Sequence, residues 1–268
     1  MLTVEALRKE VDRERLECLQ QMLAVDSNDI NPSIEKYDKL LNETFDMRKV
    51  APFDVQEHLY SNKYFCMWQH DDDLPLIILQ GTTEHPADTD LSWLSPGATH
   101  VIRNADGIFE NTRLVLQHLC QPKYNCGGYK AAGRKILSSL IFQVLKSPLG
   151  TSLIRDNESY SRVKHDIELV NQLETDRPNE ILKRLFGILG YMIGQTEAKR
   201  VLIVVDRLDV MGGDLETFID PLLRLILDVK VKVKVMLTVC APRCINSNRI
   251  RRELGANGYR ILEIDQGD

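Results

Sequence analysis

Short apolar runs alternate with longer amphipathic stretches along this chain. A short apolar run bounded by turn residues is typical of a strand buried on both faces of a parallel sheet. We expect strands of this kind at 74–81, 199–209, 231–239 and 260–265, with a further short one at His100-Val101-Ile102.

Apolar residues that recur three and four positions apart predict amphipathic helices. We expect helices at 3–24, 33–46, 109–120, 135–147, 158–174, 178–194 and 218–229. Two prolines support these limits: Pro178 suits a first helical turn, and Pro148 ends the helix before it. Alternating strands and helices predict an α/β fold with a doubly wound, mostly parallel sheet and helices on both faces.

The pattern changes near residue 70, at the acidic turn His70-Asp71-Asp72-Asp73. Residues 1–70 are predicted to be a helical N-terminal lead-in segment, and residues 71–268 an α/β core. Within the core, Val and Lys alternate over 229–235, which predicts a strand with one solvated face or an edge strand protected by lysine.

Charge and hydropathy narrow the classes of partner. The net charge is −5, so no overall basic field attracts nucleic acid or anionic lipid. No apolar run is long enough to span a membrane, and the N-terminus is charged from the start, unlike a signal segment. We therefore expect an intracellular protein, cytoplasmic or nuclear, with neither membranes nor nucleic acid as partners.

The cysteines do not form a recognisable metal or disulfide framework. They are Cys18, Cys66, Cys120, Cys126, Cys240 and Cys244. The pairs 120/126 and 240/244 lack the two-residue gap of zinc knuckles, and several of these cysteines lie in apolar stretches. We expect free thiols and no metal site.

The run VLIVVDRLD at 201–209 carries the most distinctive chemistry. Asp206 emerges at the carboxyl end of the predicted strand, where ligands of open α/β sheets collect. In P-loop NTPases one strand leads into a glycine-rich phosphate loop, and another ends in an Asp that handles magnesium. The alternative interpretation is that Asp206 caps a strand or pairs with Arg207.

Several apolar blocks, taken in order, resemble the NACHT-type STAND ATPases of fungi. The blocks are LLNETFDM, YFCMW, LPLIILQG, ILSSLIFQVL, VLIVVDRLD, PLLRLI and KVMLTV. The resemblance extends from about Cys18 to Asp265 and lies in the order and spacing of the blocks. It implies a P-loop NTPase core in which Asp206 and Asp209 are remnants of the magnesium-handling motif and Thr238 stands at a sensor position.

The resemblance places the phosphate loop at 81–88, where most of the required residues are missing. Gly81 is kept, but Pro86, Ala87 and Asp88 stand at the second-glycine, lysine and hydroxyl positions. Proline supplies no N–H to a phosphate. Alanine removes a charge-assisted hydrogen bond worth about 1.5–3 kcal/mol, and the aspartate adds a negative charge. We therefore expect no catalytic residues and no cofactor.

A second stretch, Gly128 to Lys135, has the glycine spacing of a phosphate loop. No buried strand precedes it, so chance spacing is the favoured interpretation. Lys130, Arg134 and Lys135 near a helix start remain an alternative anion site.

The sequence thus favours a catalytically inactive NACHT/STAND-like domain that binds other proteins, as an interaction or scaffold module within a larger complex. The alternative is an ATP-binding switch or ATPase with a non-standard phosphate loop, which would use ATP and magnesium. Both hypotheses expect the strand that begins near Leu76 to lie beside the strand that bears Asp206.

Overall fold

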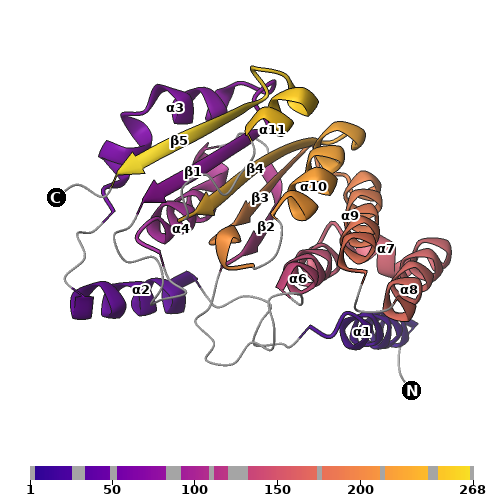
Figure 1. Cartoon of the computed structure of the whole chain (residues 1–268). Helices are drawn as coiled ribbons and strands as arrows, with labels where there is room; N and C mark the ends of the chain where they lie inside the picture. Colours follow the sequence, from indigo (N-terminus) through magenta and orange to yellow (C-terminus); the bar gives the residue numbers. More distant parts are fainter. Residues whose placement is uncertain are drawn as a thin grey trace.

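The structure of the chain is a computed structural model (Figure 1). It describes residues 4–25, 34–48, 53–82, 92–108, 112–119, 132–173, 177–211, 215–240 and 247–265. Among these residues no helix is both long and apolar enough to cross a membrane.

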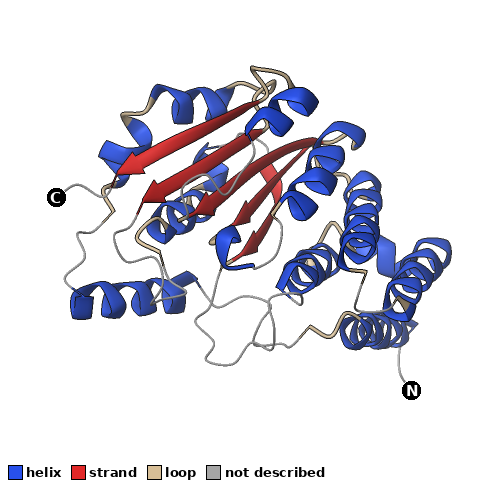
Figure 2. Ribbon diagram, viewed as in Figure 1, coloured by secondary structure: helices blue, strands red, loops and turns tan. Residues whose placement is uncertain are grey.

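Five parallel strands form one sheet in the order β2-β3-β4-β1-β5. The strands are β1 (Leu76–Thr82), β2 (Thr112–His118), β3 (Arg200–Val205), β4 (Lys232–Val239) and β5 (Tyr259–Asp265). Helices lie on both sides of the sheet (Figure 2), which confirms the predicted doubly wound parallel α/β fold.

Two hydrophobic clusters hold the helices against the two faces of the sheet. The first face carries α6 (Ala132–Lys146), α9 (Pro178–Gln195), α10 (Glu216–Asp228) and α11 (Ser247–Leu254), with α1 (Val4–Met22), α7 (Thr151–Arg155) and α8 (Asn157–Gln172) outside them. The second face carries α2 (Ile34–Arg48), η1 (Gln56–Tyr60), α3 (Lys63–His70), α4 (Ser95–Arg103) and α5 (Ala105–Ile108). A short 3₁₀ turn, η3 (Leu208–Met211), follows β3.

The N-terminal helices lie on opposite faces of the sheet. Helix α1 packs on α7 and α8, and its Leu19 and Leu23 belong to the first cluster. Helix α2 packs on α4, where Asp38 forms an ion pair with Arg103, and its Tyr37 belongs to the second cluster. Residues before position 70 therefore contribute to both sides of the core. The domain boundary at 70/71 stays a prediction.

The helix expected at 109–120 is wrong, because this segment contains strand β2. Leu114 and Leu116 pack into the first cluster, while Val115 packs against the second. The period is therefore two, as in a strand buried on both faces, and the spacing of leucines across the segment concealed it.

The strand expected at His100-Val101-Ile102 is also wrong, because these residues lie in α4. The buried residues Ala98, Val101 and Ile102 recur at helical spacing, and Pro96 occupies the first turn. Three apolar-leaning residues are too short a window to separate a strand from a buried helix.

Strand β4 is central, so the solvated or edge strand expected for 229–235 is wrong as well. Lys234 is 1% exposed, and its ammonium donates to the backbone oxygens of Trp68 (2.8 Å) and Leu74 (2.9 Å) and to that of Asp71. The ammonium therefore satisfies carbonyls at the end of α3 and in the turn before β1. Burial lowers the pKa of Lys234 to about 8.

Candidate functional site

The candidate site lies at the carboxyl edge of the sheet, where parallel strands all end. The sequence led us to expect that the strand beginning near Leu76 lies beside the strand that bears Asp206. This expectation is wrong, because β4 lies between β1 and β3. A contact with Asp206 is made instead by α4, the first described helix after β1. This helix lies against β3 and β4, and its first residue Ser95 contacts Asp206.

Asp206 is 1% exposed and accepts hydrogen bonds from three hydroxyl groups. Its Oδ2 receives Tyr37 Oη at 2.7 Å and Ser95 Oγ at 2.8 Å. Its Oδ1 receives Thr238 Oγ1 at 2.5 Å. The three donors come from α2, α4 and β4, so the carboxylate joins three elements that are distant in the sequence.

The direction of the Thr238 hydrogen bond is fixed by its neighbours. The Thr238 hydroxyl oxygen accepts the backbone N–H of Arg207 at 2.8 Å, which leaves the hydroxyl proton for Asp206. Burial raises the pKa of Asp206 above its usual range, and the bonds from the three hydroxyls oppose this shift. The hydroxyls replace the water that an exposed carboxylate would have.

Asp209 is held by a different set of partners. Arg207 donates from Nε to Asp209 Oδ1 (3.1 Å) and from Nη2 to Oδ2 (3.0 Å), and the N–H of Cys240 also donates to Oδ1 (3.1 Å). Burial alone would lower the pKa of Arg207, but the Asp209 carboxylate raises it. The guanidinium thus pairs with Asp209, and the suggested pairing of Asp206 with Arg207 is not the ion pair that forms.

Arg207 has a left-handed backbone, with φ of 57°. This conformation costs a residue other than glycine about 1–2 kcal/mol. It directs the N–H of Arg207 to Thr238 while the side chain reaches Asp209. The strained residue follows Asp206 directly, so the turn after β3 is held by the same hydrogen bonds that surround the two acids.

Cys240 lies at the end of β4, with its Sγ beside the hydroxyl of Ser92. Burial raises the pKa of the Cys240 thiol to about 12. A thiol with such a pKa is protonated at neutral pH and is a poor nucleophile.

Gly81 belongs to β1 itself. A Cβ added there would lie 2.9 Å from side-chain carbons of both Trp93 and Leu94. Trp93 and Leu94, the two residues before α4, therefore pack so closely on β1 that only glycine fits at position 81. This packing explains Gly81 without a role in binding phosphate. Pro86, Ala87 and Asp88 lie outside the described residues.

The alternative anion site is only partly described, since Lys130 lies outside the described residues. Arg134 and Lys135 are in the first turn of α6. Arg134 donates to the side-chain oxygen of Asn171 (2.5 Å), whose amide donates to the backbone oxygen of Met22 (2.9 Å). These contacts connect α6 to α8 and α1.

Sequence reasoning did not identify Tyr37 and Ser95 as partners of Asp206. They lie 169 and 111 residues away from it along the chain. The Ser95-Pro96 pair is a helix-start signal and could have placed α4. For Tyr37 the sequence shows only an apolar face of a helix.

The oxygen atoms around Asp206 are of the kind that magnesium prefers, but they are not open to it. Oδ2 already receives two hydrogen bonds, and the side chain is almost completely buried. A cation that took this oxygen would have to displace the hydroxyl of Tyr37 or Ser95. Within the described ranges no three His, Cys, Asp or Glu side chains gather as a metal site.

Comparison with family models, with curated proteins and with solved structures gives no match to this chain. The parallel sheet is compatible with a P-loop-type core. The resemblance to NACHT-type domains stays a prediction from the sequence.

Proposed function

We propose that this chain is a catalytically inactive NACHT/STAND-like domain that acts as a protein-interaction or scaffold module. One observation supports this above others. The carboxylate that would handle magnesium, Asp206, is buried and receives hydrogen bonds from hydroxyls of α2, α4 and β4.

The free energy of the hydrogen bonds that magnesium and phosphate binding would lose also supports this proposal. A hydrogen bond to a charged group contributes about 1.5–3 kcal/mol, and binding magnesium through Oδ2 would require the loss of at least one. In the sequence, Ala87 stands where a lysine would contact the phosphates, which removes a further interaction of this size. Micromolar binding corresponds to only about 8 kcal/mol, so these losses weigh heavily.

One contact favours the alternative, an ATP-binding switch. Ser95 is the first residue of α4 and donates a hydrogen bond to Asp206. A ligand near the end of β1 that shifted α4 would therefore change the contacts of Asp206. This alternative would also use Arg134 at the start of α6. Charge reversal by Arg134→Glu would then abolish any nucleotide-dependent change.

The two functions are separated by titrating the full chain into a fluorescent ATP analogue with magnesium and following the anisotropy. The proposal expects no saturable binding in the wild type, in Asp206→Asn or in Arg134→Glu. Saturable binding that Asp206→Asn removes, or that Arg134→Glu removes, would establish the switch instead.

A further inference from the structure

The two edge strands of the sheet differ in how their outer backbone groups are satisfied. Strands β2 and β5 are the outermost strands, and β5 is the yellow strand in Figure 1. Among the described strands each pairs with one neighbour, so alternate residues direct their N–H and C=O away from the sheet. An open edge of this kind is able to pair with a further strand, and natural proteins commonly protect it.

The outer edge of β2 is protected by a side chain. The N–H of Asp206 donates to the backbone oxygen of His118 (2.8 Å), so His118 faces β3 and Gln117 faces outward. There the amide of Gln143, on α6, accepts from the Gln117 N–H (2.9 Å) and donates to the Gln117 C=O (2.7 Å). The register of β2 with β3 is also irregular near its start. A strand added at this edge would have to displace Gln143.

The outer edge of β5 is open within the described part of the chain. Val235 donates its N–H to the backbone oxygen of Pro75 (2.7 Å), so the alternation along β1 directs the backbone groups of Ile78 to β5. The register sets Ile78 opposite Ile261, whose own N–H and C=O therefore point outward, as do those of Glu263. Ile261 is half-buried and Glu263 is exposed. The register is unbroken along β5, and the strand contains no proline.

Exposed apolar and basic side chains lie beside this edge, on the face of the sheet that α3 covers. Tyr64 and Met67 of α3 are 36% and 40% exposed, and their spacing makes them neighbours on the helix. The guanidinium of Arg260 in β5 lies 5.2 Å from the centre of the Tyr64 ring, and the ammonium of Lys63 lies 4.9 Å from it. Within the described ranges neither cation forms an ion pair.

We propose that the outer edge of β5 binds an extended segment of another protein, which adds to the sheet as a sixth strand. The outward N–H and C=O groups of Ile261 and Glu263 supply the hydrogen bonds to its backbone. The inference rests on the proposed interaction function and identifies the class of partner.

The side chains beside the edge select the sequence of the added segment. Successive side chains of a strand alternate between two faces, so every second residue of the segment faces α3. An apolar residue there packs on Tyr64 and Met67, and an acidic residue on the same face pairs with Arg260 or Lys63. The partner is therefore an extended segment with apolar and acidic residues at alternate positions.

A second copy of this chain fits the edge less well. On the α3 face, its β5 would present Arg260, Leu262 and Ile264. Leu262 and Ile264 are 2% and 7% exposed, so they are already buried in the second cluster and are not free to pack on Tyr64 of another copy. Arg260 would add a cation where the charges favour an acid.

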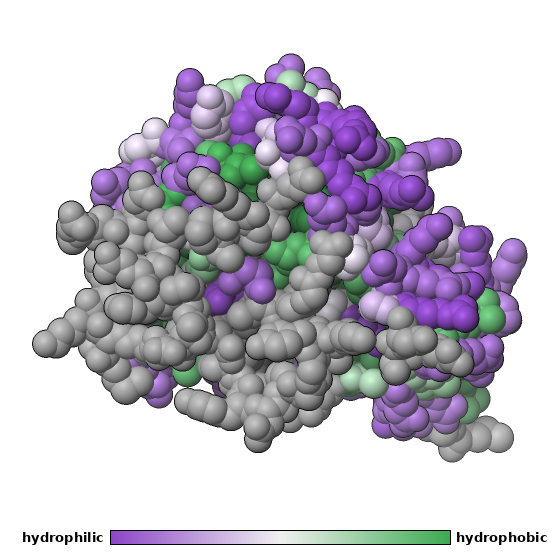
Figure 3. All heavy atoms as spheres, in the orientation of Figure 1, coloured by the Kyte–Doolittle hydropathy of each residue, from purple (hydrophilic) through white to green (hydrophobic). Residues whose placement is uncertain are grey.

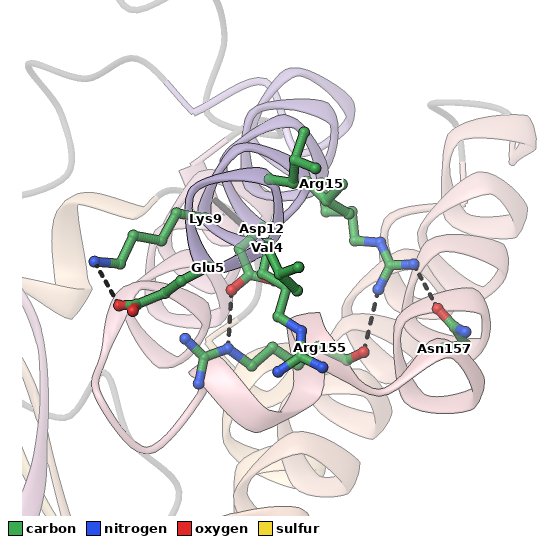
Figure 4. A pocket seen from close by; sticks show the side chains of 10 residues that line it. Val4, Glu5, Lys9, Asp12, Arg15, Arg155 and Asn157 are labelled. Atoms are coloured by element: carbon green, nitrogen blue, oxygen red, sulfur yellow. Dashed lines mark hydrogen bonds and ion pairs between the residues drawn. The ribbon is translucent and has the colours of Figure 1, made fainter. Parts of the chain in front are cut away.

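The groove between α1 and the corner where α7 meets α8 is another exposed surface (Figure 4). Hydrophobic residues are visible at the lower right of Figure 3, where α1 lies. The lining of the groove carries both signs of charge, with Arg8 and Lys9 beside Glu5 and Asp12. These charges select no class of partner, unlike the backbone groups of β5.

The test is a selection from a displayed library of random segments about eight residues long. The full chain is the target, and Ile261→Pro is used for counter-selection, because proline removes an outward N–H and leaves the bonds to β1 in place. We expect the selected segments to carry apolar and acidic residues at alternate positions. A selected segment, made as a labelled peptide and followed by anisotropy, should bind at least about tenfold more weakly to Ile261→Pro and to Tyr64→Ser.

N-methylation of the selected peptide shows whether it binds as a strand. Only every second N–H of an added strand bonds to β5, so a methyl group on one of these should abolish binding. Methyl groups on the intervening positions should be tolerated. This measurement uses the wild-type chain, so it decides the proposal even if Ile261→Pro does not fold.

The matched controls are Ile261→Val, which keeps the N–H, and Leu227→Ser on α10, since Leu227 is 53% exposed. Both controls should bind like the wild type. The proposal is overturned if no segment survives counter-selection, or if the effects of N-methylation do not alternate. It is also overturned if Ile261→Pro instead abolishes dimerisation of the chain. None of these outcomes depends on nucleotide binding, so they are separate from the test of inactivity at Asp206.

Discussion

Thr238 and Asp206 lie side by side at the ends of neighbouring strands, with Thr238 Oγ1 2.5 Å from Asp206 Oδ1. The same hydroxyl accepts the N–H of Arg207, so one side chain supports both the buried acid and the strained turn that follows it. The candidate site is thereby part of the hydrogen bonding that stabilises the fold.

Replacing Thr238 with valine should destabilise the protein. The change removes the hydrogen bond to Asp206 Oδ1 and the acceptor of the buried Arg207 N–H, at a cost of about 1–3 kcal/mol. Urea unfolding measures this loss. Thr151→Val is the matched control, because the Thr151 hydroxyl makes only a long, partly exposed bond of 3.4 Å and its loss should change stability by less than about 0.5 kcal/mol. Equal effects of the two changes would contradict the described role of Thr238.

The titration of Asp206 should appear as a pH-dependent difference from Asp206→Asn. Burial raises the pKa of Asp206 in the folded state above its ordinary value of 3.8, so the folded state holds the proton more tightly than the unfolded state. The stability of the wild type relative to the variant is therefore greatest below pH 3.8 and falls as pH rises through the raised pKa. Unfolding of both proteins across this range tests the sign, and a rise with pH would show a lowered pKa.

Lys234 should give the opposite trend at alkaline pH. Burial lowers its pKa from 10.5 to about 8 in the folded state, so the unfolded state binds the proton more tightly between these values. The stability of the wild type relative to Lys234→Met should rise from about pH 8 to 10.5. Parallel unfolding of the two proteins measures this difference in stability. If the difference did not change with pH, burial would not lower the pKa of the Lys234 ammonium.

Gly81→Ala tests whether this glycine is required by packing. The new methyl group would lie 2.9 Å from carbons of Trp93 and Leu94, and overpacking of this kind costs about 1–3 kcal/mol. Gly187→Ala in α9 is the control, because nothing lies within 4 Å of the added carbon. The control should stabilise the protein by about 0.5–1 kcal/mol. A harmless Gly81→Ala would contradict the close packing of α4 on β1.

Local patterns in the sequence predict most of this fold. The run VLIVV gives β3 with Asp206 at its carboxyl end, and Pro178 marks the start of α9. The failures occur where the pattern is shared by helix and strand, as at Leu114 to Leu116, or where tertiary contacts decide. From the sequence, Lys234 looks like a solvated residue. The three backbone carbonyls that surround its ammonium belong to Trp68, Asp71 and Leu74, which are too distant along the chain to leave a local pattern.

The candidate site shows the same division. The sequence places Asp206 and Thr238 on strands whose ends meet, but Tyr37 and Ser95 reach Asp206 through packing between α2, α4 and the sheet. Hydrogen bonds between such distant residues have no local signature. The enclosure of Asp206, which supports the proposed loss of activity, is therefore visible only in the structure.

Calorimetric titration of ATP and magnesium into the full chain tests the central claim most directly, with Asp206→Asn titrated in parallel. The account predicts that wild type and variant give the same small dilution heats, with no saturation up to about 1 mM nucleotide, a concentration that corresponds to only about 4 kcal/mol of binding. A saturable, micromolar signal in the wild type that disappears in Asp206→Asn would contradict it.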